Sequence, residues 1–119
     1  MKYYNSERLV LETYATSLYE NFLDVAKQLN PNIEISFLEF LLMIKMEPGN
    51  LPDYCVKNLN LPPSFIKFLE DRFLLKENGK YRYPKNIFFI EIEKWDDEKI
   101  KRFALEVEEK KRMVKKIYS

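Results

Sequence analysis

Apolar residues recur at three- and four-residue steps over much of this 119-residue chain, a spacing that predicts a mainly α-helical protein. The first stripe covers residues 6–29 and ends before Pro31, which stops a helix. Residues 37–46 are apolar on nearly every face, which is typical of a helix at the centre of a core. Ser36 and Glu39 have the spacing of a capping box at the start of this second helix.

Two shorter helices are predicted in the middle of the chain, after the turn EPGN. One starts beside Asn50, a good capping residue, and reaches about Leu59. The other runs from about Pro63 to Leu74, with Ile66, Leu69 and Phe73 on its buried face. By subtraction, its outward side chains are expected to be Ser64, Phe65, Lys67, Phe68 and Asp71.

The remaining part of the chain begins with a β-hairpin signal, because Asn78-Gly79 favours a tight two-residue turn. The residues IFFIEI at 87–92 are rich in β-formers and predict a further strand. A last amphipathic helix is expected from Asp96 to about residue 117. The expected fold class is therefore mainly α with a small β-hairpin, in one domain spanning residues 1–119.

Charge is unevenly distributed, although the net charge is only +1. Residues 1–75 carry seven basic and ten acidic side chains, whereas residues 76–119 carry thirteen and nine. The segment KENGKYRYPKN at 76–86 has four basic residues and one acidic residue. Positive charge therefore gathers in the hairpin and the last helix, where a phosphate backbone would use it.

The order of these elements and the residues FLEFLLMIKMEPGNLPDYCVKNLNLPPSFIKFLEDRFLL resemble the MarR and SarA family of winged-helix transcription regulators. IFFIEIEKWDDEKI is similar to the second wing strand and the C-terminal helix of that family. The hairpin departs from the family pattern, because Arg82 has no obvious Asp partner. Pro62 and Pro63 also replace the polar residues that often begin the recognition helix. The resemblance implies a winged helix-turn-helix at about 50–75, a wing at about 75–92, and dimerisation helices at about 6–29 and 96–117.

A protein of this kind is expected to bind double-stranded DNA as a homodimer on a palindromic site and to regulate transcription. The residues expected at the DNA are Ser64, Phe65, Lys67, Phe68, Lys76, Lys80, Tyr81, Arg82 and Lys85. The residues expected at the dimer interface are Leu11, Tyr14, Leu18, Phe103, Val107, Val114 and Ile117.

Three features have alternative interpretations. Phe65 and Phe68 either press on bases, pack inside the protein, or form an apolar patch for a protein partner. The lysines of the hairpin either contact phosphates or protect an edge strand from aggregation. The basic run KKRMVKK at 110–116 either extends a phosphate-binding surface or is the solvated end of a helix. The alternative function is a winged-helix protein-interaction module, in which Phe65, Phe68 and Tyr81 grip a partner and DNA affinity is negligible.

Enzymatic chemistry has little basis in this sequence. Histidine is absent, which excludes Ser-His and Cys-His nucleophiles and histidine metal ligands. Glu91 and Glu93 would share one face of a strand, but a third carboxylate for a metal ion is not evident. Cys55 could be a redox switch, but it falls at a buried helix position, where a thiol is inert. We therefore expect no catalytic residues, metal or cofactor.

The cellular location is expected to be the cytoplasm. A single cysteine allows no intrachain disulfide. The N-terminal residues MKYYNSERLV lack the apolar stretch of a signal peptide, and the longest apolar run is too short to cross a bilayer, so no membrane partner is expected.

Overall fold

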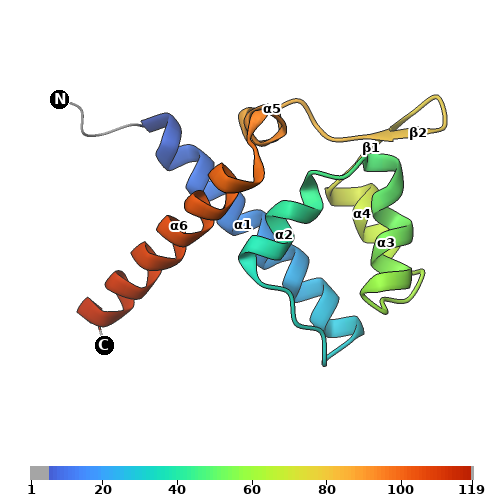
Figure 1. Ribbon diagram of the computed structural model, residues 1–119. Helices are drawn as coiled ribbons and strands as arrows, with labels where there is room; N and C mark the ends of the chain where they lie inside the picture. Colours follow the sequence, from blue (N-terminus) through green and yellow to red (C-terminus); the bar gives the residue numbers. More distant parts are fainter. Residues whose placement is uncertain (1–5, 119) are drawn as a thin grey trace.

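A computed structural model of the chain describes residues 6–118, with side chains described for residues 7–113. Within this range the fold is mainly helical with a small antiparallel hairpin. The elements are α1 (Ser6–Leu29), α2 (Phe37–Ile44), the 3₁₀ helix η1 (Pro48–Asn50), α3 (Leu51–Asn58), α4 (Phe65–Arg72), β1 (Leu75–Glu77), β2 (Lys80–Arg82), α5 (Ile87–Lys94) and α6 (Asp97–Tyr118). The long helices α1 and α6 cross at one end of the molecule, and α3, α4 and the hairpin lie at the other, with α2 between them (Figure 1).

The first two helices form as the sequence predicts. α1 has the expected bounds. The amide of Asn30, the residue after the helix, still donates to the Ala26 carbonyl. The capping box at the start of α2 is confirmed, because the Ser36 hydroxyl accepts from the Glu39 amide and the Glu39 carboxylate accepts from the Ser36 amide. α2 buries five of its eight residues and contacts both α1 and α6, as expected for a central helix.

The core is built around the aromatic ring of Phe22 on α1. Its centroid lies 5.1 Å from Phe65, 5.3 Å from Phe40 and 5.6 Å from Phe73. The four rings meet at tilted or edge-on angles, the geometry that aromatic quadrupoles prefer. Phe22 therefore joins α1 to α2 and to both ends of α4.

The expected strand at 87–92 is wrong, because these residues form the helix α5. The Asn86 side chain accepts a hydrogen bond from the Phe89 amide at 3.1 Å, which caps the first turn of a helix. Phe88, Phe89 and Ile92 are buried, a spacing that fits a helix and not the alternation of a strand. The hairpin ends at Arg82, and Pro84 removes a backbone donor that a longer sheet would need.

The hairpin itself is confirmed. Leu75 pairs with Arg82, and Glu77 pairs with Lys80 across the turn. Asn78 and Gly79 have φ angles of 52° and 77°, as a type I′ turn requires. Right-handed strand twist favours this turn, so the register of the three-residue strands is set by two residues.

The last helix starts at Asp97, one residue after the predicted start, with Asp96 accepting from the Lys99 amide at 2.8 Å. Its stripe of Ile100, Phe103 and Val107 is buried, as predicted. Within the described part of the chain, no helix is both long and apolar enough to cross a membrane.

Most residues predicted at the dimer interface pack within the core of one chain. Leu11, Phe103 and Val107 are at most 6% exposed and belong to the core, so the prediction that they face a second subunit is wrong. They are buried because α6 folds back over α1 and α2 and covers these apolar stripes. Tyr14 and Leu18 pack partly against the same core. Val114 and Ile117 lie outside the described side chains.

A buried carboxylate, Glu12, ties the crossing of α1 and α6 together. Glu12 is 7% exposed. It accepts from Arg8 Nε at 2.8 Å and from Lys110 Nζ at 2.9 and 3.0 Å. Arg8 also pairs with Glu106 on α6. The surface pair of Glu20 with Lys111, at 3.3 Å, lies further along α1.

The replacement Phe22→Ala is expected to lower the free energy of unfolding by about 3–5 kcal/mol, because it removes a fully buried ring and leaves a cavity among three others. Urea unfolding followed by circular dichroism measures this loss. The control Leu105→Ala removes a side chain that is 60% exposed and should change stability by less than about 0.5 kcal/mol. Equal losses in the two variants would contradict the proposed core.

The replacement Glu12→Gln is expected to lower the unfolding free energy by about 1–2 kcal/mol, because it keeps the shape but removes the charge that two cations share. Glu20→Gln is the matched control, since it also removes an α1 carboxylate paired with an α6 lysine, but an exposed one. Its loss should stay below about 0.5 kcal/mol. Thermal unfolding of both variants at low and high salt would show whether the two pairs differ as expected.

Candidate nucleic-acid interface

Helices α3 and α4 are joined by a turn that the core holds in place. Asn60 lies in the left-handed region at φ 54°. The Asn30 side chain at the end of α1 donates to the carbonyl of Leu59 at 3.3 Å, and the Leu61 amide donates to the Cys55 carbonyl. Leu61 is buried under the turn. The two helices are therefore positioned by anchors in the turn as well as by their own packing.

Helix α4 is rotated relative to the sequence-based expectation. Phe65 was expected to face outward, but it is fully buried against Phe22, so that prediction is wrong. The prolines delay the regular helix to Phe65, and Phe65 and Leu69 then share one buried face at a spacing of four residues. Leu69 and Phe73 are buried as predicted, whereas Ile66 is only half-buried.

Phe68 is half-buried and lies 5.1 Å from the ring of Phe65. Of the interpretations considered for the two phenylalanines, internal packing therefore describes Phe65 fully and Phe68 in part. Phe65 is unavailable to a thymine methyl group or to a protein partner. Ser64, Lys67 and Asp71 are exposed, as expected.

The hairpin is fixed to α4 through Glu70, a residue that the sequence did not single out. The Tyr81 hydroxyl donates to the Glu70 carboxylate at 2.5 Å, and Lys76 Nζ lies 3.8 Å from the same carboxylate. Lys76 also lies over the Tyr81 ring, 5.2 Å from its centroid. Lys67 is three residues before Glu70, so it lies on the same side of α4 as the residue that contacts the hairpin.

Arg82 has a carboxylate partner after all, but it is Glu77 rather than an Asp. The guanidinium makes two parallel hydrogen bonds to Glu77, at 2.7 and 3.0 Å. This pairing lowers the pKa of Glu77 and raises that of Arg82. The signal was available in the sequence, because a two-residue turn after Glu77 brings residue 82 close to it on the opposite strand.

Lys76, Lys80 and Lys85 are exposed on or beside the hairpin. Two of the positive charges there are offset by acidic neighbours, Lys76 by Glu70 and Arg82 by Glu77. We define the phosphate surface as the exposed residues Ser64, Lys67, Lys76, Lys80 and Lys85 together with the half-buried Arg82.

The basic run at 110–116 has a structural role where its side chains are described. Lys110 pairs with Glu12 and Lys111 with Glu20, which fastens α6 to α1. Lys115 and Lys116 lie outside the described side chains.

The acidic and cysteine side chains in the described part of the chain do not gather into a metal site. No cluster of three acidic, histidine or cysteine side chains that could hold a metal ion occurs there. Glu91 and Glu93 were expected on one face of a strand, and this is wrong, because two residues along the helix α5 point in nearly opposite directions. Cys55 is fully buried, and burial raises the pKa of its thiol to about 12.

Tyr83 follows the hairpin and lies between it and the helical core. Its hydroxyl donates to the Met46 carbonyl at 3.3 Å. Its ring stacks on Phe89, with centroids 4.9 Å apart and planes at 8°. Burial raises the pKa of the Tyr83 phenol above the usual 10, and electrostatic interactions with Cys55 and Glu47 add to the effect.

No family model, curated protein or solved structure matches this chain significantly.

The raised pKa of Tyr83 predicts that the protein loses stability in alkali. Above pH 10, the unfolded phenol releases its proton while the folded phenol keeps it, so the unfolding free energy falls as pH rises. The contribution is at most about 1.4 kcal/mol per pH unit. Urea unfolding between pH 9 and about 11.5 should therefore show a shallower decline for Tyr83→Phe than for the wild type.

The same two proteins compared at pH 7 provide the control. At that pH the phenol is protonated in both states, so any difference there reports only the lost hydrogen bond to Met46. Parallel declines above pH 10 would contradict the assignment.

Proposed function

We propose that this chain binds double-stranded DNA through its phosphate surface, with α4 against the major groove and the hairpin against the flanking backbone. One observation carries the proposal: Glu70 holds Tyr81 and Lys76 of the hairpin against the side of α4 that also carries the exposed Lys67. A cationic surface on a rigid frame suits phosphate contact, because its side chains are already positioned before binding.

The order α2, α3, α4, β1, β2 supports a winged helix-turn-helix, in which α4 is the recognition helix and the hairpin is the wing. The coarse fold is compatible with this assignment. The departure lies after the wing, where α5 replaces a second long strand. The bidentate pair of Arg82 with Glu77 would stiffen the wing and direct the remaining guanidinium edge outward.

This surface would discriminate weakly between DNA sequences. The exposed residues of α4 are Lys67, Glu70, Asp71 and Arg72, which include no Asn or Gln for adenine and a single arginine for guanine, at the last position of the helix. Glu70 and Asp71 would repel phosphates that came close to them. The affinity would therefore come mainly from phosphate contacts and depend strongly on salt.

The proposal is made for a single subunit. The apolar stripes of α1 and α6 that were expected at a dimer interface pack within one chain. Regulation of transcription as a homodimer on a palindrome would need another contact surface, and two sites one DNA turn apart. Selection of bound duplexes from a random pool tests this role, and enrichment of a palindromic sequence would support a homodimeric regulator.

The alternative of a protein-interaction module is less well supported. Two of its three gripping residues are already engaged, Phe65 in the core and Tyr81 by Glu70. The offsetting of hairpin charges by Glu70 and Glu77 is the observation in its favour. Failure to bind DNA at low salt would therefore shift the proposal to this alternative.

Fluorescence anisotropy with a labelled random-sequence duplex tests DNA binding at about 50 and 200 mM salt. With about four phosphate contacts, the affinity should fall roughly 100-fold over this range. The double variant Lys67→Ala/Lys80→Ala should bind more weakly at 50 mM salt and lower the salt slope by about two.

The matched control is Lys94→Ala/Lys101→Ala, which removes two exposed lysines from α5 and α6, away from the phosphate surface. It should retain the wild-type affinity and slope. An equal loss in both double variants would show only a response to net charge and would contradict the assigned surface.

A further inference from the structure

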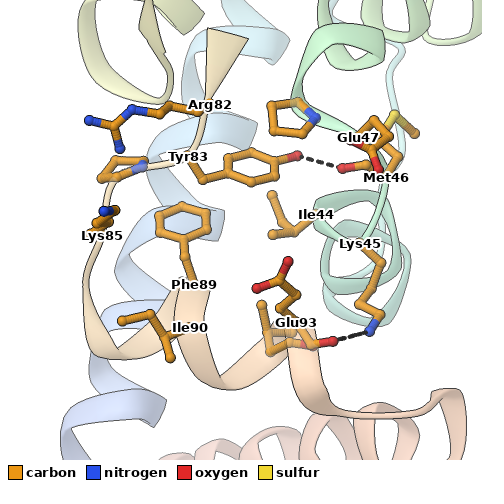
Figure 2. A pocket seen from close by; sticks show the side chains of 13 residues that line it. Ile44, Lys45, Met46, Glu47, Arg82, Tyr83, Lys85, Phe89, Ile90 and Glu93 are labelled. Carbon is orange, nitrogen blue, oxygen red and sulfur yellow. Dashed lines mark hydrogen bonds between the residues drawn. The ribbon is translucent and has the colours of Figure 1, made fainter.

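A cavity of about 520 Å³ lies behind the hairpin, between the C-terminal end of α2, η1, the chain after β2, and α5. Its volume falls within the range of small-molecule sites. It shares Arg82 and Lys85 with the phosphate surface, but its wall also contains apolar side chains, among them Ile44, Phe89 and Ile90 (Figure 2).

One wall of the cavity is an ordered aromatic pair. Tyr83 and Phe89 stack with nearly parallel planes, and the hydrogen bond from Tyr83 to the Met46 carbonyl holds the phenol in place. Figure 2 shows both rings standing side by side opposite Ile44. A fixed aromatic wall offers a negative π-electron face, which attracts organic cations.

Two of the three cations that line the cavity, Arg82 and Lys45, are held by other groups. Arg82 is bound to Glu77, whereas Lys85 is exposed and has no ion-pair partner among the described side chains. Lys45 Nζ donates to three backbone carbonyls around the end of α5, those of Ile92, Glu93 and Trp95, at 3.3, 3.0 and 2.7 Å. The charges of Arg82 and Lys45 are therefore directed to the hairpin and to a helix end rather than to the cavity.

The two carboxylates of the cavity, unlike Arg82 and Lys45, are not held by other groups in the described part of the chain. Glu47 and Glu93 line the cavity, and among the described side chains neither has an ion-pair partner. In Figure 2 the Glu93 carboxylate points into the space between Phe89 and Ile44. The charge of Glu47 reaches the Tyr83 hydroxyl, where it contributes to the raised pKa. The cavity thus combines apolar side chains, a stacked aromatic pair and two carboxylates that pair with no described cation, with Lys85 as an exposed cation that pairs with no described carboxylate.

We propose that this cavity binds a hydrophobic organic cation, such as a planar aromatic or alkyl-substituted ammonium compound. The apolar part of the ligand would lie against Ile44, Ile90 and the Tyr83–Phe89 pair, and its positive charge would lie near Glu93. Burial of apolar surface would provide most of the affinity, and the carboxylate would select the sign of the charge. The cavity shares Arg82 and Lys85 with the phosphate surface, but ligand binding there does not require that surface to bind DNA.

Rhodamine 6G, a planar aromatic cation, is a suitable fluorescent probe, and fluorescein is a control with a related ring system and negative charge. Fluorescence anisotropy with the full-length protein, in the absence of DNA, should show saturable binding of rhodamine 6G and negligible binding of fluorescein. Equal binding of both dyes would overturn the proposal, because it would show an apolar site without charge selection. Absence of saturable rhodamine binding would also overturn it.

The variant Glu93→Gln keeps the shape of the side chain and removes its charge. It should weaken rhodamine 6G binding roughly tenfold, since a charge beside an aromatic wall is partly shielded from water. Glu91→Gln is the matched control, because Glu91 is on the same helix, does not line the cavity and pairs with Lys94 on the surface. Glu93 is exposed and Glu91 is half-buried, so neither replacement alters the core and both variants should fold, which circular dichroism would verify. Equal affinities for the two variants would overturn the role of Glu93.

Discussion

The position of the Phe22 ring determines how the rest of the molecule is arranged. Its contacts join α1 to α2 through Phe40 and to the two ends of α4 through Phe65 and Phe73. Because these four rings are buried together, the rotation of α4 about its own axis is set by the core. The face of α4 that carries Lys67 is therefore exposed as a consequence of which phenylalanines are taken inside. The hairpin then takes its place from α4, through Tyr81 and Glu70.

Local signals in the sequence predicted those elements whose structure depends on near neighbours. The capping box at Ser36, the Asn78-Gly79 turn and the stripe of α1 all act within a few residues, and each was recovered. The prediction of a strand at IFFIEI was wrong, because β-branched and aromatic residues suit either a strand or a buried helix. The deciding features were the Asn86 cap and the absence of a sheet edge beside it, which depend on the neighbouring fold. The burial of Phe65 likewise depends on Phe22, more than forty residues away along the chain.

The electrostatic features of the candidate site were predictable only in part. The lysines of the hairpin could be recognised from composition, but their neutralising partners could not be assigned in the same way. Glu77 is within reach through the hairpin register, whereas Glu70 belongs to α4 and becomes a partner only when the hairpin folds against that helix. The same limitation applies to the cavity behind the hairpin, whose residues come from α2, the chain after β2, and α5. Neither Glu47 nor Glu93 has a local pattern that would mark it as part of one site.

The bond between Glu12 and Lys110 joins residues 98 positions apart. A contact of such long sequence separation closes nearly the whole chain into a loop, which is entropically unfavourable until the intervening elements have compacted. The crossing of α1 and α6 is therefore expected to form late in folding and to open early in unfolding. The aromatic interior around Phe22 would therefore form before the ion pairs that join α1 to α6, those of Arg8 with Glu106, Glu12 with Lys110 and Glu20 with Lys111. If these ion pairs broke first, α6 would separate from α1 while α2, α3 and α4 remained packed together.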